Sequence, residues 1–115
     1  MLIEKYVMDY LSEKLGVPVY GQFDDATEKV FLVIEKTGSY TSNKIEHATL
    51  VVQSYTGSIA ESAKLNRKVI KAMDNIIEND TISSIDLNSD YNYTDTSLKR
   101  YRYQAVFDIT YLDYE

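Results

Sequence analysis

Hydrophobic residues near the start of the chain recur every three or four positions, which is the spacing of one helix face. Ile3, Val7 and Leu11 belong to this stripe, and charged residues occupy many of the positions between them. The pattern predicts an amphipathic helix over residues 2–15, and Gly16 is placed to end it. Because Pro18 cannot continue a helix, residues 17–20 are expected to form a short extended piece at a sheet edge.

The middle of the chain has the pattern of two strands. A polar connector over residues 21–29 is followed by a continuous apolar run of strand length over residues 30–34. Residues 47–56 alternate, with Leu50 and Val52 on one face and Val51 and Tyr55 on the other. These segments predict an antiparallel hairpin. We expect a long turn region over residues 38–46, with a polar tip over residues 40–44.

Residues 58–77 combine a helix start with a helical stripe. Ser58 and Glu61 have the spacing of a capping box, in which each side chain bonds the backbone N–H of the other residue. The helix should extend to about Ile77. Its predicted inner stripe consists of Ser62, Leu65, Val69, Ala72, Met73 and Ile76.

The last third of the chain predicts a second hairpin. We expect a strand over residues 82–87 with Ile85 and Leu87 inward, a polar loop over residues 88–100, and a strand over residues 101–112. In the last strand one face carries Tyr103, Ala105, Phe107, Ile109 and Tyr111, and the other carries Arg102, Gln104, Asp108 and Thr110.

Together these elements predict a single α+β domain over residues 1–115. Its sheet should be mostly antiparallel, with four or five strands and both helices packed on one face. A chain of 115 residues is long enough to bury one hydrophobic core without a metal or disulfide.

Composition narrows the function classes. The chain contains 11 Tyr, 3 Phe and no Trp, which favours a sheet with a tyrosine-bearing surface. It has no Cys, so disulfides, thiolate metal sites and a cysteine nucleophile are excluded. The net charge is −6, and the one dense basic cluster, Lys99, Arg100 and Arg102, has acidic neighbours. Specific nucleic-acid binding is therefore not expected, and the sequence predicts neither a membrane span nor a signal peptide.

The residues that could carry chemistry do not form a recognisable catalytic constellation. His47 is the single histidine, and one histidine cannot build a histidine-rich metal site. The Asp24–Asp25 pair and the two aspartates Asp90 and Asp95 fall in polar segments, which indicates solvated charge. The alternative is a weak loop site for magnesium. We expect no enzymatic activity and no cofactor, apart from a weak possibility that Mg²⁺ aids assembly.

Several segments together resemble a known family. They are VPVYG (residues 17–21), FLVIEKTG (31–38), ATLVVQSY (48–55) leading into SIAESA (58–63), YNY (91–93) followed by Asp95, and RYQA (102–105). In this order and spacing they resemble the small tail-terminator or tail-completion (head–tail joining) proteins of long-tailed bacteriophages and prophages. The resemblance covers most of the chain.

The resemblance implies a virion protein without catalytic residues, assembled in the host cytoplasm. Its subunits would form a ring, often a hexamer, on the end of the tail tube. The ring would stop tube growth and present a surface to the head connector. The partners implied are thus the chain itself, the tail tube protein and the head connector protein.

The long polar turn regions are the candidate contact sites for such a ring, because they are rich in tyrosine and polar residues. The candidate interface residues are Tyr40, Asn43, Lys44, Tyr91, Tyr93, Asp95, Arg100 and Tyr101.

Three other functions remain open from the sequence. A head-side connector or neck protein would have a similar size. A small ligand- or nucleic-acid-binding regulator could use the tyrosine-rich sheet, with Tyr91, Tyr93, Tyr101 and Tyr103 stacking on bases. A small hydrolase would depend on the carboxylates of the last loop.

Overall fold

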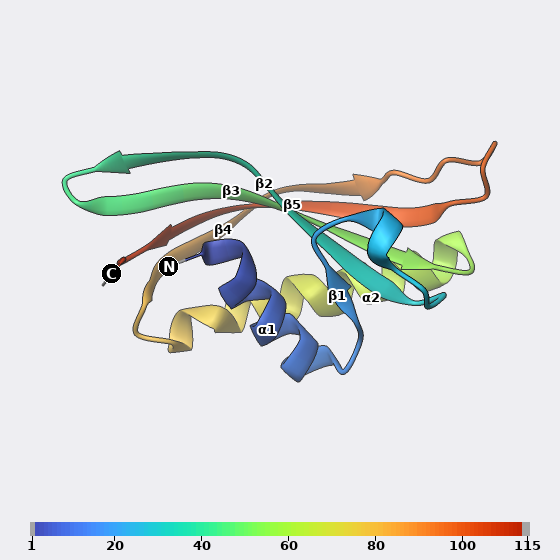
Figure 1. Ribbon diagram of the computed structural model, residues 1–115, viewed down its shortest axis with the longest axis horizontal. Coiled ribbons are helices and arrows are strands. Elements are labelled where there is room, and N and C mark those ends of the chain that lie inside the picture. Colours follow the sequence, from blue (N-terminus) through green and yellow to red (C-terminus); the bar gives the residue numbers. More distant parts are fainter. Residues whose placement is uncertain (1, 114–115) are drawn as a thin grey trace.

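The computed structural model describes residues 2–113, which form one mixed sheet covered by two helices (Figure 1). The strand order is β1-β2-β3-β5-β4. Short β1 is parallel to β2, and the other neighbours are antiparallel. The elements are α1 (Ile3–Leu15), β1 (Val19–Tyr20), 3₁₀ helix η1 (Phe23–Asp25), β2 (Phe31–Ser42), β3 (Ile45–Thr56), α2 (Ile59–Asp74), 3₁₀ helix η2 (Asn75–Glu78), β4 (Ile82–Asn92) and β5 (Tyr101–Tyr111). The predicted α+β class, with both helices on one face, is confirmed.

The main core lies between the helices and the sheet, where the sequence pattern placed it. Ile3, Val7 and Leu11 of α1 are buried, and all six residues of the stripe predicted for the second helix are buried as well, five of them on α2 and Ile76 on η2. Gly16 ends α1 with φ of 66°, as expected for a left-handed helix cap. Neither helix within residues 2–113 is long and apolar enough to cross a membrane.

The start of α2 confirms half of the predicted capping box. The Ser58 hydroxyl accepts a hydrogen bond from the Glu61 N–H at 3.2 Å. The reciprocal bond is not formed, because the Ser58 N–H instead donates to Thr56 Oγ1 at 3.3 Å. The Glu61 carboxylate lies 3.5 Å from Lys64 Nζ. A nearby threonine hydroxyl thus replaces the carboxylate as acceptor.

The predicted long turn over residues 38–46 is wrong. β2 continues to Ser42 and β3 begins at Ile45, so the turn consists of Asn43 and Lys44 alone, with φ of 51° and 65°. Two central residues with positive φ are the signature of the tight turn that matches the twist of a hairpin. The sequence pattern did not reveal these outer strand residues, because their side chains are mostly polar. They still form strands, since the backbone hydrogen bonds between β2 and β3 need no buried side chain.

The second hairpin is also longer than predicted. β4 continues to Asn92, so the polar loop shortens to residues 93–100, which we call the β4–β5 loop. Asp90 therefore lies in a strand rather than in a loop. Leu87, expected to point inward, is 40% exposed, since it lies on an edge strand.

A second, smaller hydrophobic cluster occupies the sheet face opposite the helices. Phe31, Val33 and Tyr55 are buried there, and Phe23 of η1 packs against them. The connector over residues 21–29, predicted to be merely polar, thus carries an aromatic side chain back onto the sheet. The molecule measures 45 × 24 × 23 Å, and the β2–β3 and β4–β5 hairpins extend from its opposite ends (Figure 1).

Candidate functional site

Near its turn, the β2–β3 hairpin carries an aromatic pair, with exposed Tyr40 on β2 and partly buried His47 on β3. The ring of Tyr40 is 65% exposed and stacks on the ring of His47, with 4.4 Å between centroids and 7° between planes. His47 Nδ1 lies 3.2 Å from the Thr110 hydroxyl on β5. The hydroxyl of Thr41 donates to the Glu46 carboxylate at 2.8 Å. These contacts link β2, β3 and β5 close to the turn.

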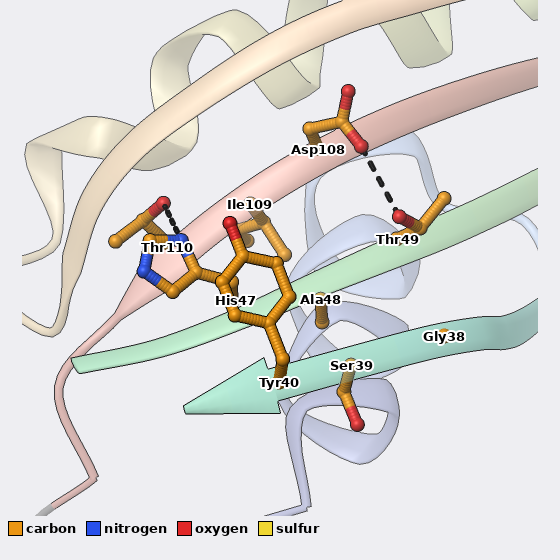
Figure 2. Close-up of a pocket in the computed structure, with 9 residues that line it drawn as sticks. All are labelled: Gly38, Ser39, Tyr40, His47, Ala48, Thr49, Asp108, Ile109 and Thr110. Carbon is orange, nitrogen blue, oxygen red and sulfur yellow. Dashed lines mark hydrogen bonds between the residues drawn. The ribbon is translucent and has the colours of Figure 1, made fainter. Parts of the chain in front are cut away.

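A shallow hollow of about 270 Å³ lies beside this pair (Figure 2). In Figure 2 the Tyr40 ring covers His47, while the Asp108 carboxylate is bonded to Thr49 at 3.1 Å. Asp108 also accepts a bond from the Asn88 side chain at 3.2 Å. His47 is therefore held by a hydroxyl and not by this carboxylate, so the two residues do not form the base and orienting acid of a hydrolytic triad.

At the other end of the sheet, Arg102 holds the beginning of the β4–β5 loop. Its Nε donates to the Tyr93 carbonyl at 2.7 Å, and a terminal nitrogen donates to the Tyr55 hydroxyl at 2.8 Å. The guanidinium also lies 4.5 Å from the Tyr93 ring centroid. Beside it, the Tyr55 hydroxyl bonds Gln53, whose amide bonds Gln104 at 2.8 Å. This network joins β3, β5 and the loop across the open face of the sheet.

The same end contains a pocket of about 320 Å³, which we call the aromatic pocket. It lies between η1, the end of β3 and the β4–β5 loop. Its aromatic lining comprises Phe23, Phe31, Tyr55 and Tyr101, and its cationic lining comprises Lys29, Lys99 and Arg100. Phe31 and Tyr55 stack at 4.7 Å, and the Arg100 guanidinium lies 4.3 Å from the Phe23 ring centroid.

One carboxylate, Glu28, also lines the aromatic pocket. The Tyr20 hydroxyl lies 2.6 and 2.9 Å from its two oxygens. This bond is the main cause that lowers the pKa of Glu28 from its ordinary value and raises that of Tyr20. Glu28 therefore stays ionised and bound to Tyr20, and the lining retains an excess of positive charge.

The structure divides the eight predicted interface residues between the two ends of the molecule. Tyr40, Asn43 and Lys44 are exposed at the β2–β3 turn. The other five lie on β4, β5 or the β4–β5 loop: Tyr91, Tyr93, Asp95, Arg100 and Tyr101.

Two residues of this second group line the aromatic pocket, and one has an internal role. Arg100 and Tyr101 are pocket residues. Asp95 accepts bonds from the Ser97 hydroxyl at 2.7 Å and the Leu98 N–H at 3.2 Å. The Ser97 bond is the largest cause that lowers the pKa of Asp95. Asp95 thus stabilises the loop from within.

Several pocket residues were missed because they come from separate parts of the chain. Phe23 and Lys29 precede the first hairpin, Phe31 begins β2, and Tyr55 lies near the end of β3. The alternation in β3 did place Tyr55 on the face opposite Leu50 and Val52, and the structure shows that this face is the one without helices. Nothing in the sequence showed that the connector returns to that face.

The structure does not bring the aspartates named in the sequence analysis into a metal site. Within residues 2–113 there is no group of three or more histidine, cysteine or acidic residues that could hold an ion. Asp90 instead accepts a hydrogen bond from the buried Asn66 side chain at 3.1 Å.

Comparisons with known proteins leave the family open. No protein-family model matches the chain. A search of curated proteins finds no match either.

Proposed function

We propose that the chain is a structural subunit that assembles with copies of itself into a closed ring. The main support for this proposal is that two different exposed surfaces lie at opposite ends of an elongated molecule. One is the β2–β3 turn with Tyr40, and the other is the β4–β5 loop, where Leu98 is 59% exposed. Unlike ends favour head-to-tail contacts, which close into rings when the rotation between subunits allows it.

The sheet edges support the same arrangement. β4 is an edge strand of 11 residues, and at the other edge β1 pairs with only Leu32 and Val33 of β2. Among residues 2–113 no strand pairs with the distal part of β2 on this side, so that part has a free edge as well. An exposed strand edge is a template for pairing with another chain, and subunits of a ring can use it for that purpose.

The position of the ring in a virion is inferred from the sequence resemblance. Tail-terminator proteins place such a ring on the end of a phage tail tube, where it ends growth and joins the tail to the head. We assign the same role to this chain, with the tail tube protein and the head connector protein as its further partners.

The test combines assembly with tube binding. Sedimentation velocity over a range of protein and Mg²⁺ concentrations, with electron microscopy, should reveal closed rings, either free or on the ends of purified tail tubes. Tyr40→Ser should weaken assembly, because it removes an exposed ring from the hairpin end. Glu13→Ser, on the exposed side of α1, is the matched control.

Two results would contradict the proposal. One is a strict monomer under every condition that also fails to bind tube ends. The other is normal rings and joining-competent tails after the β4–β5 loop is replaced by a short turn.

A further inference from the structure

We infer that the aromatic pocket binds the segment around η2 of a second copy of this chain. We call residues 74–80, which include η2, the acidic turn. The inference rests on the proposed function, and it names the two surfaces that meet between neighbouring subunits.

The pocket has the chemistry to bind an acidic segment with an apolar side chain. Its lysines and Arg100 are not paired within residues 2–113, where the ion pairs of 4.0 Å or less involve Lys5, Lys36 and Lys64. The one carboxylate of the lining is bound by Tyr20. Unpaired cations beside aromatic rings in one pocket favour an anionic partner that also covers apolar surface.

The cations of the β4–β5 loop are held in place by its backbone. Asp95 and Arg100 exchange two backbone hydrogen bonds of 3.0 and 2.9 Å. Lys99 between them has φ of 53°, a conformation that is unfavourable for a lysine. A fixed loop places its charges at a lower entropic cost of binding than a mobile loop would.

The acidic turn has the complementary chemistry. Ile77 is 50% exposed, and it is surrounded in sequence by the exposed carboxylates of Asp74, Glu78 and Asp80. From Asp74 to Leu98 the chain contains no lysine or arginine. Since an exposed isoleucine among carboxylates fits an aromatic hollow bordered by cations, these two surfaces match in both polarity and charge.

The fold prevents the acidic turn from reaching the pocket of its own chain. The pocket includes Gly57, just before α2, whereas the acidic turn begins at the end of α2. A helix of 16 residues spans about 24 Å. The β4–β5 loop, which lines the pocket, and the end of α2, where the acidic turn begins, lie toward opposite ends of the long axis (Figure 1). The contact must therefore join two copies head to tail.

Exchange of charges between the two surfaces tests this contact. Lys99→Glu/Arg100→Glu in the pocket, or Glu78→Lys/Asp80→Lys in the acidic turn, should each weaken self-association by at least about tenfold in sedimentation experiments. An equimolar mixture of the two variants should restore assembly, because each altered surface then meets a complementary one. Arg67→Glu/Lys68→Glu, on the exposed side of α2, makes the same charge change as the pocket variant and should have little effect.

Covalent trapping provides a second readout, since the chain has no cysteine. A protein with Ile77→Cys and Lys99→Cys should form disulfide-linked multimers under mild oxidation. A protein with Ile77→Cys and Arg67→Cys, whose second site is exposed on α2 away from the pocket, should remain largely monomeric. Circular dichroism checks that each variant is folded.

The outcomes separate this inference from the proposed function. Rings that form equally well in the wild type and in all charge variants would overturn the inference and leave the ring itself intact. Folded variants that the mixture does not rescue would overturn it as well. A wild type that stays monomeric at every concentration, binds no tube ends and gives no linked multimers would overturn both.

Discussion

Arg102 offers the sharpest test of how the β4–β5 end is held together. Its guanidinium donates to Tyr55 on β3 and to the Tyr93 carbonyl, and it lies against the Tyr93 ring. Arg102→Met keeps an unbranched stem but removes both hydrogen bonds and the cation. We therefore expect the protein to become less stable and the β4–β5 loop to become more mobile.

The expected loss can be estimated from these contacts. A hydrogen bond to a charged group contributes about 1.5–3 kcal/mol, and an exposed cation–π contact about 0.5–1 kcal/mol. These contributions do not simply add, because Tyr93 is 45% exposed and water can replace the bond to its carbonyl. We expect the free energy of unfolding to fall by about 2 kcal/mol.

Urea unfolding followed by circular dichroism measures this change. With an m-value of about 1–3 kcal/mol/M, the midpoint should fall by about 1 M. Arg67→Met, which removes an exposed arginine from α2, should leave the midpoint nearly unchanged. Tyr55→Phe combined with Arg102→Met should be less than additive by roughly 1 kcal/mol, since both changes break the same bond. Strict additivity, or a midpoint for Arg102→Met equal to that of the Arg67 control, would refute the reasoning.

Three further predictions concern single contacts. Ser54 is fully buried and its hydroxyl has no hydrogen-bond partner among residues 2–113, so Ser54→Ala should keep or raise the melting temperature, and a clear decrease would contradict this. Ser58→Ala removes the bond to the Glu61 N–H and should cost about 1 kcal/mol in urea unfolding, whereas Ser58→Asp should retain most of the stability. Tyr20→Phe should raise the pKa of Glu28 in an NMR titration, because the Tyr20 bond lowers it. Because the pKa of Glu28 is lower in the folded protein than in the unfolded chain, the stability that this bond contributes is present at pH values above the unfolded pKa. It is lost as the pH falls through the folded pKa. A Glu28 pKa that does not change in Tyr20→Phe would show that the bond does not form in solution.

Local patterns were sufficient for the helices and for the buried face of most strands, with Leu87 on edge strand β4 as an exception. The stripe from Leu65 to Ile76 is buried as predicted, because a helix that packs on a sheet must bury its apolar side. Gly16 and Ser58 end and begin their helices through local backbone chemistry. Strand lengths were underestimated, because paired residues beyond the core are polar and show no hydrophobic alternation.

The sequence by itself determined the α+β class, most of the inward residues and the polar, tyrosine-bearing character of both hairpin ends. Only the tertiary structure decided which of these residues meet. Alternation placed Tyr55 and Arg102 each on the side of its own strand opposite the more apolar face. The antiparallel register of β3 and β5 then makes the two residues direct neighbours. The aromatic pocket likewise requires Phe23 to return to the sheet beside Arg100. Such contacts depend on long-range pairing and packing, whereas a periodic pattern reports only which side of its own element is buried.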